Sequence, residues 1–530
     1  MNDGLGDWPE PIGAYNAAVD FVDRNVAEGR GDKLAFIDPK RSLTYRQLQA
    51  RSNRFTNALP RLGIGRERRI MMIMLDTCEF PVVFWGAIKA GVVAIPINTL
   101  LTLEQWKFMI EDSRADAVVI SGDLLARARP VLDDISARRH LHVIVSDGGP
   151  GPRDIAIDDL LAGSSEDAEA APTNADETAF WLYSSGSTGN PKGTRHVHSS
   201  PYWSARSYGL GILGMRTEDV NYSVAKLFFA YGLGNGMNFP MAVGATTVLY
   251  PDRVTPDVAL SIMREHNPTV FYCVPTLYAA LLAHPELGPG AGSNRLRICS
   301  SAGEALPDDV GRRWQEKVGI EILDGIGSTE MLHIFCSNRT GQVRYGSSGV
   351  PLPNYEAKIV DDDGKVLGPG EIGELVIKGP TASEGYWNQR ARSRRTFAGE
   401  WTHTGDKYRV DEDGYYWCCG RTDDMFKVSG IWVSPFEVES ALITHPAVLE
   451  AAVIGREDTD GLLKPKAFII LKAGHVASDK LLDELKEHVK VKAGMWKYPR
   501  WVEVRTELPK TATGKIQRFK LRAEDHPSTS

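Results

Sequence analysis

The chain has 530 residues, of which 42% are hydrophobic and 24% are charged. These fractions are ordinary for a folded globular protein and exclude a disordered, highly charged chain. The 61 basic and 68 acidic residues leave a net charge of −7, so the chain has no overall basic character suited to nucleic acid. At roughly 150 residues per domain, this length predicts about three or four structural units.

The six cysteines match neither a disulfide framework nor a zinc-binding pattern. We interpret the adjacent pair Cys418 and Cys419 as strand residues of a protein in a reducing compartment. The acidic N-terminus lacks the apolar segment of a secretory signal, and no run reaches the roughly 18 apolar residues of a membrane span. We therefore expect a cytoplasmic protein with no membrane and no nucleic-acid partner.

Short apolar runs alternate with amphipathic stretches in the first part of the chain. Buried strands are predicted at residues 69–75, 91–97, 117–120 and 143–145, and a helix at residues 103–113. Continuous apolar strands separated by helices are typical of parallel sheets covered on both faces. Residues 147–175 are rich in Gly, Pro, Ser, Asp and Ala, which predicts a surface linker.

The pattern changes after about residue 350. Residues 361–364 and 411–414 predict tight turns between alternating runs such as residues 374–377, which indicates antiparallel hairpins. In the tail, helices are predicted at 438–444 and 478–491, and strands at 451–454 and 466–470. The expected fold class is therefore α/β with antiparallel β portions.

A loop rich in Ser, Thr and Gly spans residues 183–193 and follows the apolar run 180–182. Its glycines let backbone N–H groups turn toward an anion, its hydroxyls add donors, and Lys192 adds a positive charge. The loop is not a Walker A motif, because Lys192 is followed by Gly193 instead of Ser or Thr. A loop of this composition is often only a linker, but the clustering of Thr188 and Lys192 with three glycines favours phosphate binding.

This loop resembles the phosphate loop of the acyl-adenylate-forming superfamily, which includes acyl-CoA synthetases, firefly luciferase and the adenylation domains of peptide synthetases. Further motifs resemble those of the superfamily in the same order along nearly the whole chain. They lie at residues 324–330, 373–375 with 385–387, 401–406, 420–424 and 509–515. The resemblance implies a large N-terminal domain of stacked αβ layers with a β-barrel-like part over residues 1–422. It also implies a small mobile α+β C-terminal domain over residues 423–530, with its hinge at Asp423.

The resemblance implies an ATP- and AMP-binding site. Its expected residues are Ser184, Ser185, Gly186, Ser187, Thr188, Gly189, Lys192, Gly303, Glu304, Asp324, Ile326, Gly327, Thr329, Asp406 and Arg421. Asp406 and Arg421 are expected on the ribose. Glu330 and Thr188 are expected to support Mg²⁺, which binds few carboxylates together with substrate phosphates. Taken alone, Glu330 is an ordinary surface carboxylate and Asp406 an ordinary turn residue. The chain departs from the family at Ile326, where the family often has a tyrosine stacked on adenine.

Two lysines are implied to serve the two half-reactions, together with Glu330 as the catalytic set. Lys515 is expected over the reacting carboxylate and the α-phosphate, where a positioned cation stabilises the developing negative charge. Lys427 is expected to face the site only during thioester formation, after the small domain rotates about Asp423. Each is otherwise a plain surface or strand lysine.

The segment 226–235 and the run 327–335 closely resemble those of bacterial benzoate–CoA and 4-hydroxybenzoate–CoA ligases. An acyl site is therefore implied at Ala230, Tyr231, Gly327, His333 and Ile334. Tyr231 or His333 is a candidate partner for a ring hydroxyl. From composition alone, these aromatic side chains are better explained as core residues.

The second substrate is expected to be CoA, held in part by Trp496, Lys497 and Tyr498. The alternatives are an aryl-AMP ligase that loads a carrier-protein pantetheine, and a ligase for another acid such as 2-aminobenzoate or 3-hydroxybenzoate. The implied cofactors and partners are ATP, Mg²⁺, CoA and an aromatic acid. The oligomeric state, monomer or homodimer, stays open.

Overall fold

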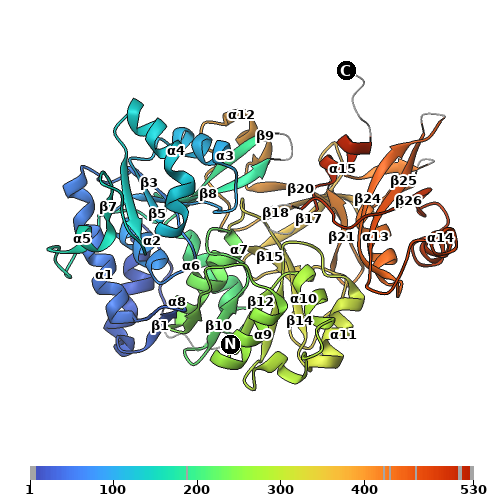
Figure 1. The fold of residues 1–530 in the computed structure, drawn as a ribbon, viewed down its shortest axis with the longest axis horizontal. Coiled ribbons are helices and arrows are strands. Elements are labelled where there is room, and N and C mark those ends of the chain that lie inside the picture. The colour runs from blue at the N-terminus through green and yellow to red at the C-terminus, as the bar shows by residue number, and fades with distance from the viewer. Residues whose placement is uncertain are drawn as a thin grey trace.

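The computed structural model describes residues 8–186, 189–421, 424–428, 431–459, 462–510 and 516–525. At residues 185, 186, 189, 427, 431 and 432 it describes the backbone alone. Figure 1 shows a large N-terminal part and a small C-terminal part at the other end of the long axis. The fold is mixed α/β with antiparallel portions, as the sequence predicted.

A seven-stranded sheet has the order β7-β6-β5-β3-β4-β8-β9 and is parallel except for the β8–β9 hairpin. Its strands are β3 (Arg69–Ile73), β4 (Val93–Pro96), β5 (Ala117–Ser121), β6 (His142–Ser146), β7 (Ile155–Ala156), β8 (Thr178–Gly186) and β9 (Gly189–Val197). Its helices are α1 (Tyr45–Ala58), α2 (Glu79–Lys89), α3 (Leu103–Ser113), α4 (Gly122–Arg138) and α5 (Ile157–Leu161). The predicted strands and the predicted helix at residues 103–113 are confirmed.

The two faces of this sheet belong to different cores. Ile70 and Met72 pack with α1 and α2, whereas Met71 and Ile73 pack with α3 and α4. Side chains of a strand alternate between faces, so a continuous apolar run such as β3 requires cover on both. The expectation of a plain linker at 147–175 was wrong in part, because Ile157, Leu160 and Leu161 form α5 and are buried.

A nine-stranded sheet has the order β16-β15-β14-β13-β12-β10-β11-β1-β2. Its strands are β1 (Leu34–Ile37), β2 (Ser42–Thr44), β10 (Val220–Ser223), β11 (Thr246–Val248), β12 (Val270–Cys273), β13 (Ile298–Ser301), β14 (Ile322–Gly327), β15 (Ile334–Ser337) and β16 (Val350–Pro351). Its helices are α6 (Ser200–Ser204), α7 (Ala230–Leu233), α8 (Phe239–Val243), α9 (Pro256–His266), α10 (Pro275–Leu282) and α11 (Asp308–Val318). One core joins it to the first sheet, and α9, α10 and α11 cover its other face.

An antiparallel sheet follows, as the turn residues predicted. It contains β17 (Glu356–Val360), β18 (Gly373–Lys378), β19 (Phe397–Ala398), β20 (Trp401–Val410) and β21 (Tyr416–Arg421), with α12 (Arg390–Thr396) beside it. Gly364 and Gly414 have φ of +82° and +84°, the left-handed conformation in which glycine is favoured. Cys418 and Cys419 lie in β21, and all six cysteines are free thiols.

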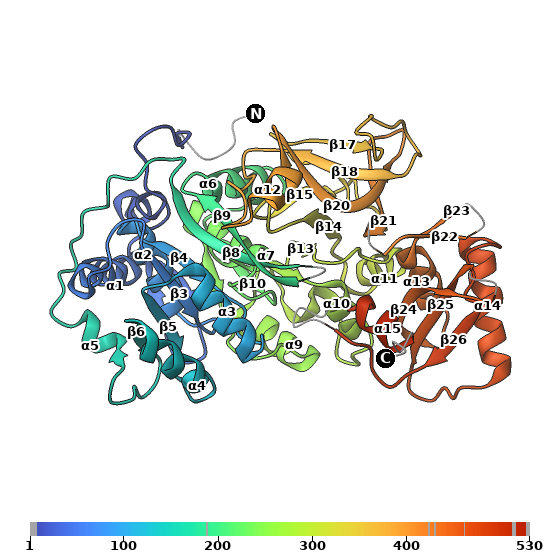
Figure 2. The ribbon, with the colours of Figure 1, turned by 90° about the horizontal axis from the view of Figure 1, so that it is seen from above.

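The small C-terminal part has its own sheet and core (Figure 2). Its elements are β22 (Phe426–Val428), β23 (Ile431–Val433), α13 (Pro435–Ile443), β24 (Val448–Glu457), β25 (Leu463–Leu471), α14 (Asp479–Ala493), β26 (Trp501–Val504) and α15 (Arg518–Asp525). The Ser478 side chain caps α14 by accepting from the Leu481 N–H. The predicted domain boundary at 422/423 falls outside the described residues and stays a prediction. Within the described part of the chain, no helix is long and apolar enough to cross a membrane.

Candidate nucleotide and acyl site

One turn, residues 328–333, joins β14 to β15 and carries Glu330. The Ser328 N–H donates to the His333 carbonyl oxygen at 3.3 Å, which closes the turn. Glycine is required at Gly327, because a Cβ there would lie 2.4 Å from the His333 carbonyl oxygen. The close approach of the two strands therefore fixes where Glu330 and His333 emerge.

Three side chains converge on one oxygen of Glu330. Tyr386 donates its hydroxyl to Oε1 at 2.8 Å, Lys192 donates at 3.2 Å and Ser184 at 3.3 Å. The Lys192 ammonium also lies 4.5 Å from the centre of the Tyr386 ring. Among the described residues, Oε2 of Glu330 receives no side-chain donor. We call these four residues the Glu330 cluster.

The electrostatics of the Glu330 cluster keep its carboxylate charged. Burial opposes ionisation, but Lys192 and the Tyr386 hydroxyl outweigh it and hold the pKa of Glu330 below its ordinary value. The side chains of Glu330 and Lys192 are only 15% and 14% exposed. An ionised carboxylate with one oxygen free of side-chain donors fits the hard oxygen ligand that Mg²⁺ prefers.

His196, on β9, supports the same turn from behind. Its Nε2 lies 2.9 Å from the Thr329 carbonyl oxygen, so Nε2 carries the proton and donates. The ring stacks on Phe180, and burial lowers the pKa of His196 to about 4. A neutral histidine thus anchors Thr329, one residue before Glu330. Neither His196 nor Tyr386 was among the predicted site residues, although Tyr386 stands in a quoted motif.

The predicted ribose residues lie opposite each other on β20 and β21. Arg421 Nη1 donates to Asp406 Oδ1 at 2.8 Å, and the two residues are paired in the strand register. Glu374, on β18, accepts from the Gly405 N–H at 3.0 Å and contacts the His403 ring at 3.0 Å. Glu374 therefore holds the part of β20 that presents Asp406, a role the sequence prediction did not assign.

The other predicted nucleotide-binding residues differ in burial and in position. Asp324 is only 2% exposed, and burial raises its pKa to about 8. Its carboxyl group accepts from the Leu306 N–H at 3.4 Å and is thus engaged within the protein. A direct contact of Asp324 with ATP stays a prediction. Ile326 is half-buried at the end of β14, and Gly303 has φ of +98° in the loop after β13 that also carries Glu304.

Tyr231 and His333 meet in a second cluster of rings, with centroids 5.4 Å apart. His333 Nε2 lies 3.2 Å from both the Tyr231 carbonyl oxygen and Asn235 Oδ1. Both oxygens accept, so Nε2 carries the proton, and no group in the described part of the chain hydrogen-bonds to the acceptor Nδ1. Burial lowers the pKa of His333 to about 3, which keeps the ring neutral. We call these residues and the rings around them the His333 cluster.

The Tyr231 hydroxyl is already engaged inside the protein. It lies 3.0 Å from Ser300 Oγ, which contacts the Tyr208 hydroxyl at 2.8 Å, and 3.4 Å from the Cys273 carbonyl oxygen. Ala230, next to Tyr231, is half-buried, and Ile334 is 2% exposed. The predicted acyl residues are thus brought together. The hydrogen bond between Ser300 and the Tyr231 hydroxyl was not predicted from the sequence.

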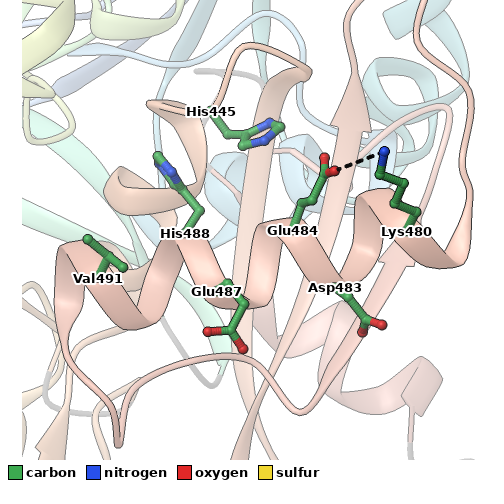
Figure 3. Close-up of a pocket in the computed structure, with 7 residues that line it drawn as sticks. All are labelled: His445, Lys480, Asp483, Glu484, Glu487, His488 and Val491. Atoms are coloured by element: carbon green, nitrogen blue, oxygen red, sulfur yellow. Dashed lines mark ion pairs between the residues drawn. The ribbon is translucent and has the colours of Figure 1, made fainter.

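The predicted CoA segment lies on the small domain. Trp496 is 56% exposed, whereas Lys497 forms an ion pair with Glu437 at 2.6 Å. The ring centre of Tyr498 lies 3.6 Å from the guanidinium of Arg500 and 4.3 Å from the ammonium of Lys490. A hollow of about 680 Å³ on α14 contains no predicted site residue (Figure 3); it is lined by His445, Lys480, Asp483, Glu484, Glu487, His488 and Val491.

Several predictions fall outside the described part of the chain. Ser187, Thr188, Asp423 and Lys515 are not described, nor are the side chains of Ser185 and Lys427. The backbone of Gly186 and Gly189 closes the β8–β9 hairpin, where the two residues are paired. The roles predicted for these residues remain predictions.

Known proteins resemble the chain along its whole length. The family model for an AMP-binding enzyme matches residues 23–387, and that for the AMP-binding enzyme C-terminal domain matches residues 437–515. The chain is 55% identical to a benzoate–CoA ligase of Thauera aromatica, covering 96% of each chain. It is 52% identical to a 4-hydroxybenzoate–CoA/benzoate–CoA ligase of Rhodopseudomonas palustris, covering 97% of this chain and 94% of that one.

A solved benzoate CoA ligase from Burkholderia xenovorans LB400 superposes with a TM-score of 0.89 at 48% identity, over 96% of this chain and 100% of that one. The matched models together span most of the 530 residues, and they include both the phosphate loop and the Glu330 turn. The chain therefore belongs to the AMP-binding enzyme family.

Proposed function

We propose that the protein activates benzoate or 4-hydroxybenzoate with ATP and transfers the aryl group to CoA, giving aryl-CoA, AMP and diphosphate. The observation that carries this proposal is that one turn bears both Glu330, in a charged cluster, and His333, in a cluster of rings. An acyl-adenylate needs its phosphate and its aryl group held side by side. Relatives named as ligases for these two acids, at 52% and 55% identity, support the same substrate class.

In the first half-reaction, a carboxylate oxygen of the aromatic acid attacks the α-phosphorus of ATP. The bond to the β-phosphate oxygen breaks and diphosphate leaves with its electron pair. Negative charge builds on both sides of phosphorus, so positioned cations supply most of the catalysis. Lys192 and Lys515 are the proposed cations, and no protein nucleophile or base is required.

ATP enters such a site as its magnesium complex. Glu330 and Thr188 are the proposed supports, Glu330 through the oxygen that receives no side-chain donor among the described residues. When bound, Mg²⁺ neutralises phosphate charge and orients the leaving diphosphate. The chain's own contribution is to keep Glu330 ionised, through Lys192, and oriented, through Tyr386.

In the second half-reaction, the thiolate of CoA attacks the acyl carbon and AMP leaves. Lys427 and a rotation about Asp423 are proposed for this step. Asp406 and Arg421 hold the ribose throughout. Trp496, which is exposed, is the strongest candidate among the three CoA residues, because the ammonium of Lys497 is already paired with Glu437.

The His333 cluster supports recognition of the ring by shape more than by hydrogen bonds. The Tyr231 hydroxyl is satisfied internally, and among the described residues of this cluster the acceptor Nδ1 of His333 is a polar atom left open. An apolar slot rejects an added hydroxyl by only about 10²-fold, whereas a slot that hydrogen-bonds it discriminates by 10⁴-fold or more. We therefore expect similar use of benzoate and 4-hydroxybenzoate.

The test is an assay of the purified protein with ATP, Mg²⁺ and a panel of acids, with AMP and free aryl-CoA measured separately. AMP and aryl-CoA are both expected with benzoates. An aryl-AMP ligase serving a carrier protein would make the adenylate but no free thioester. Preference for 2-aminobenzoate or 3-hydroxybenzoate would redirect the substrate assignment, and activation of octanoate without benzoate would refute the aromatic substrate.

A further inference from the structure

Four charged residues form an ion-pair cluster inside the small domain. Arg518 and Arg522 lie on α15, Glu439 lies on α13, and Asp424 lies one residue beyond the proposed hinge position. Arg522 Nη1 contacts Asp424 Oδ1 at 2.8 Å, and Arg518 Nη1 contacts Asp424 Oδ2 at 3.5 Å. Two cations therefore hold the chain directly after the hinge.

Arg518 is the centre of this cluster. Its Nη2 and Nε donate to Glu439 at 2.7 Å and 3.0 Å. Among protein side chains, only a guanidinium makes this bidentate contact with a carboxylate. Glu439 is 5% exposed at its side chain and also accepts from the Val453 N–H at 2.7 Å. Arg518 thus joins the hinge end to α13 and, through Glu439, to the edge strand β24.

The large domain also acts on Arg518. Burial opposes its charge, but Glu439, Asp424 and then Glu304 hold the pKa of Arg518 above its ordinary value. Glu304 belongs to the predicted nucleotide site. Figure 2 shows α15 at the edge of the small domain that faces the large domain, with the β22–β23 hairpin farther out.

Both ends of the segment that bears Lys515 are described, and both are fixed. The Gln517 N–H donates to the Pro509 carbonyl oxygen at 2.8 Å, and Lys510 and Ile516 form an antiparallel bridge. Lys510 also pairs with Glu450 on β24 at 2.6 Å. Arg518 lies two residues after Ile516, so its contact with Asp424 connects the C-terminal end of this segment to the hinge end.

We propose that Arg518 is a positioning residue that locks α15, and with it the described ends of the Lys515 segment at Lys510 and Ile516, to the hinge end at Asp424, so that adenylation by Lys515 depends on Arg518. This proposal rests on the proposed role of Lys515 in adenylation. It assigns no contact with substrate to Arg518. Loss of these contacts should lower adenylation, the step assigned to Lys515, more than it lowers thioester formation.

The first test compares half-reactions. Arg518→Met should lower benzoate-dependent diphosphate exchange about tenfold, while thioester formation from supplied benzoyl-AMP and CoA changes less than about twofold. Arg518→Lys, which keeps the charge but cannot bind Glu439 in two prongs, should fall between Arg518→Met and the wild type. The matched control is Arg505→Met, which removes the ion pair to Glu524 at the other end of α15. It should leave the ratio of the two half-reaction rates unchanged.

A double-mutant cycle separates action through Lys515 from general damage. In a Lys515→Ala background, Arg518→Met should cost less than about twofold in diphosphate exchange, because the lysine it positions is gone. A full tenfold cost in that background, or an equal loss in both half-reactions, would overturn the proposal.

Amide hydrogen exchange tests the lock without catalysis. Arg518→Met should speed exchange in residues 424–428 and 516–525 together, whereas Arg505→Met should affect only the end of α15. Unchanged exchange at 424–428 would refute the coupling. A wild type that shows no diphosphate exchange with any benzoate would refute the proposed function instead, and the exchange rates would still decide the lock.

Discussion

Two side chains of the turn at residues 328–333, Glu330 and His333, lie in surroundings of opposite character. At Glu330, an ammonium and two hydroxyls converge on an ionised carboxylate. At His333, a neutral imidazole is surrounded by aromatic rings, and its single N–H is satisfied by the protein. The Glu330 cluster presents charged groups to a charged ligand, whereas the His333 cluster presents an apolar, uncharged surface. Substitutions should therefore act through electrostatics at the first cluster and through burial at the second.

The largest effect is expected from Lys515→Ala. On the charged side of the site, loss of one preorganised cation should lower benzoate adenylation by about two orders of magnitude or more. Thioester formation from supplied benzoyl-AMP should largely survive. Diphosphate exchange and single-turnover thioester formation measure the two steps. Equal losses in both would show that Lys515 has no role specific to the first half-reaction.

Asp423→Pro tests whether the two half-reactions require one orientation of the small domain relative to the two clusters or two orientations. Proline fixes φ near −65° and should impede rotation of the small domain. Diphosphate exchange should persist, while CoA-dependent turnover falls to near background. Lys427→Ala should shift the balance in the same direction by a smaller amount. Normal overall turnover of the proline variant would mean that no large rotation is needed.

His333→Gln tests the neutrality of the ring cluster. The pKa of His333 is about 3 in the folded protein and ordinarily 6.5. The neutral ring therefore contributes fully to the stability of the fold above pH 6.5, and this contribution is lost as the pH falls toward 3. The difference in unfolding free energy between wild type and variant should therefore change by about 2 kcal/mol between pH 7 and pH 5. Denaturant unfolding at both pH values measures it. A constant difference would show that His333 titrates normally.

Tyr386→Phe tests the orientation of the charged cluster. The hydroxyl donates to the carboxylate of Glu330, and a hydrogen bond to a charged group contributes about 1.5–3 kcal/mol. We expect the KM for magnesium–ATP in diphosphate exchange to rise about tenfold. Tyr355→Phe, which removes a buried hydroxyl bonded to Thr381, is the matched control and should leave this KM unchanged. The idea fails if both variants behave alike.

The smallest effect is expected from Tyr231→Phe. Its hydroxyl is engaged by Ser300 and the Cys273 carbonyl oxygen, so its removal should alter the ratio of kcat/KM for 4-hydroxybenzoate over benzoate by less than about threefold. A large preference for 4-hydroxybenzoate that is lost in this variant would make the ring cluster a directed hydrogen-bonding site, and the contrast with the Glu330 cluster would disappear.

Most elements were predictable because their signals are local. The apolar run of β3, the turn glycines Gly364 and Gly414 and the cap of α14 each depend on a few neighbouring residues. The linker prediction at 147–175 failed at α5 for a tertiary reason, since three apolar side chains of a polar stretch find the main core.

The sequence by itself determined the motifs, their order and the two residues of the turn that face the two clusters. Only the tertiary structure decided the partners. Tyr386 reaches Glu330 from 56 residues away, and Ser300 takes the Tyr231 hydroxyl from 69 residues away. The Tyr231 carbonyl oxygen sets the tautomer of His333 across a separation of 102 residues. Short-range patterns record backbone conformation, whereas side-chain hydrogen bonds and pKa values depend on which distant strands and helices are packed together.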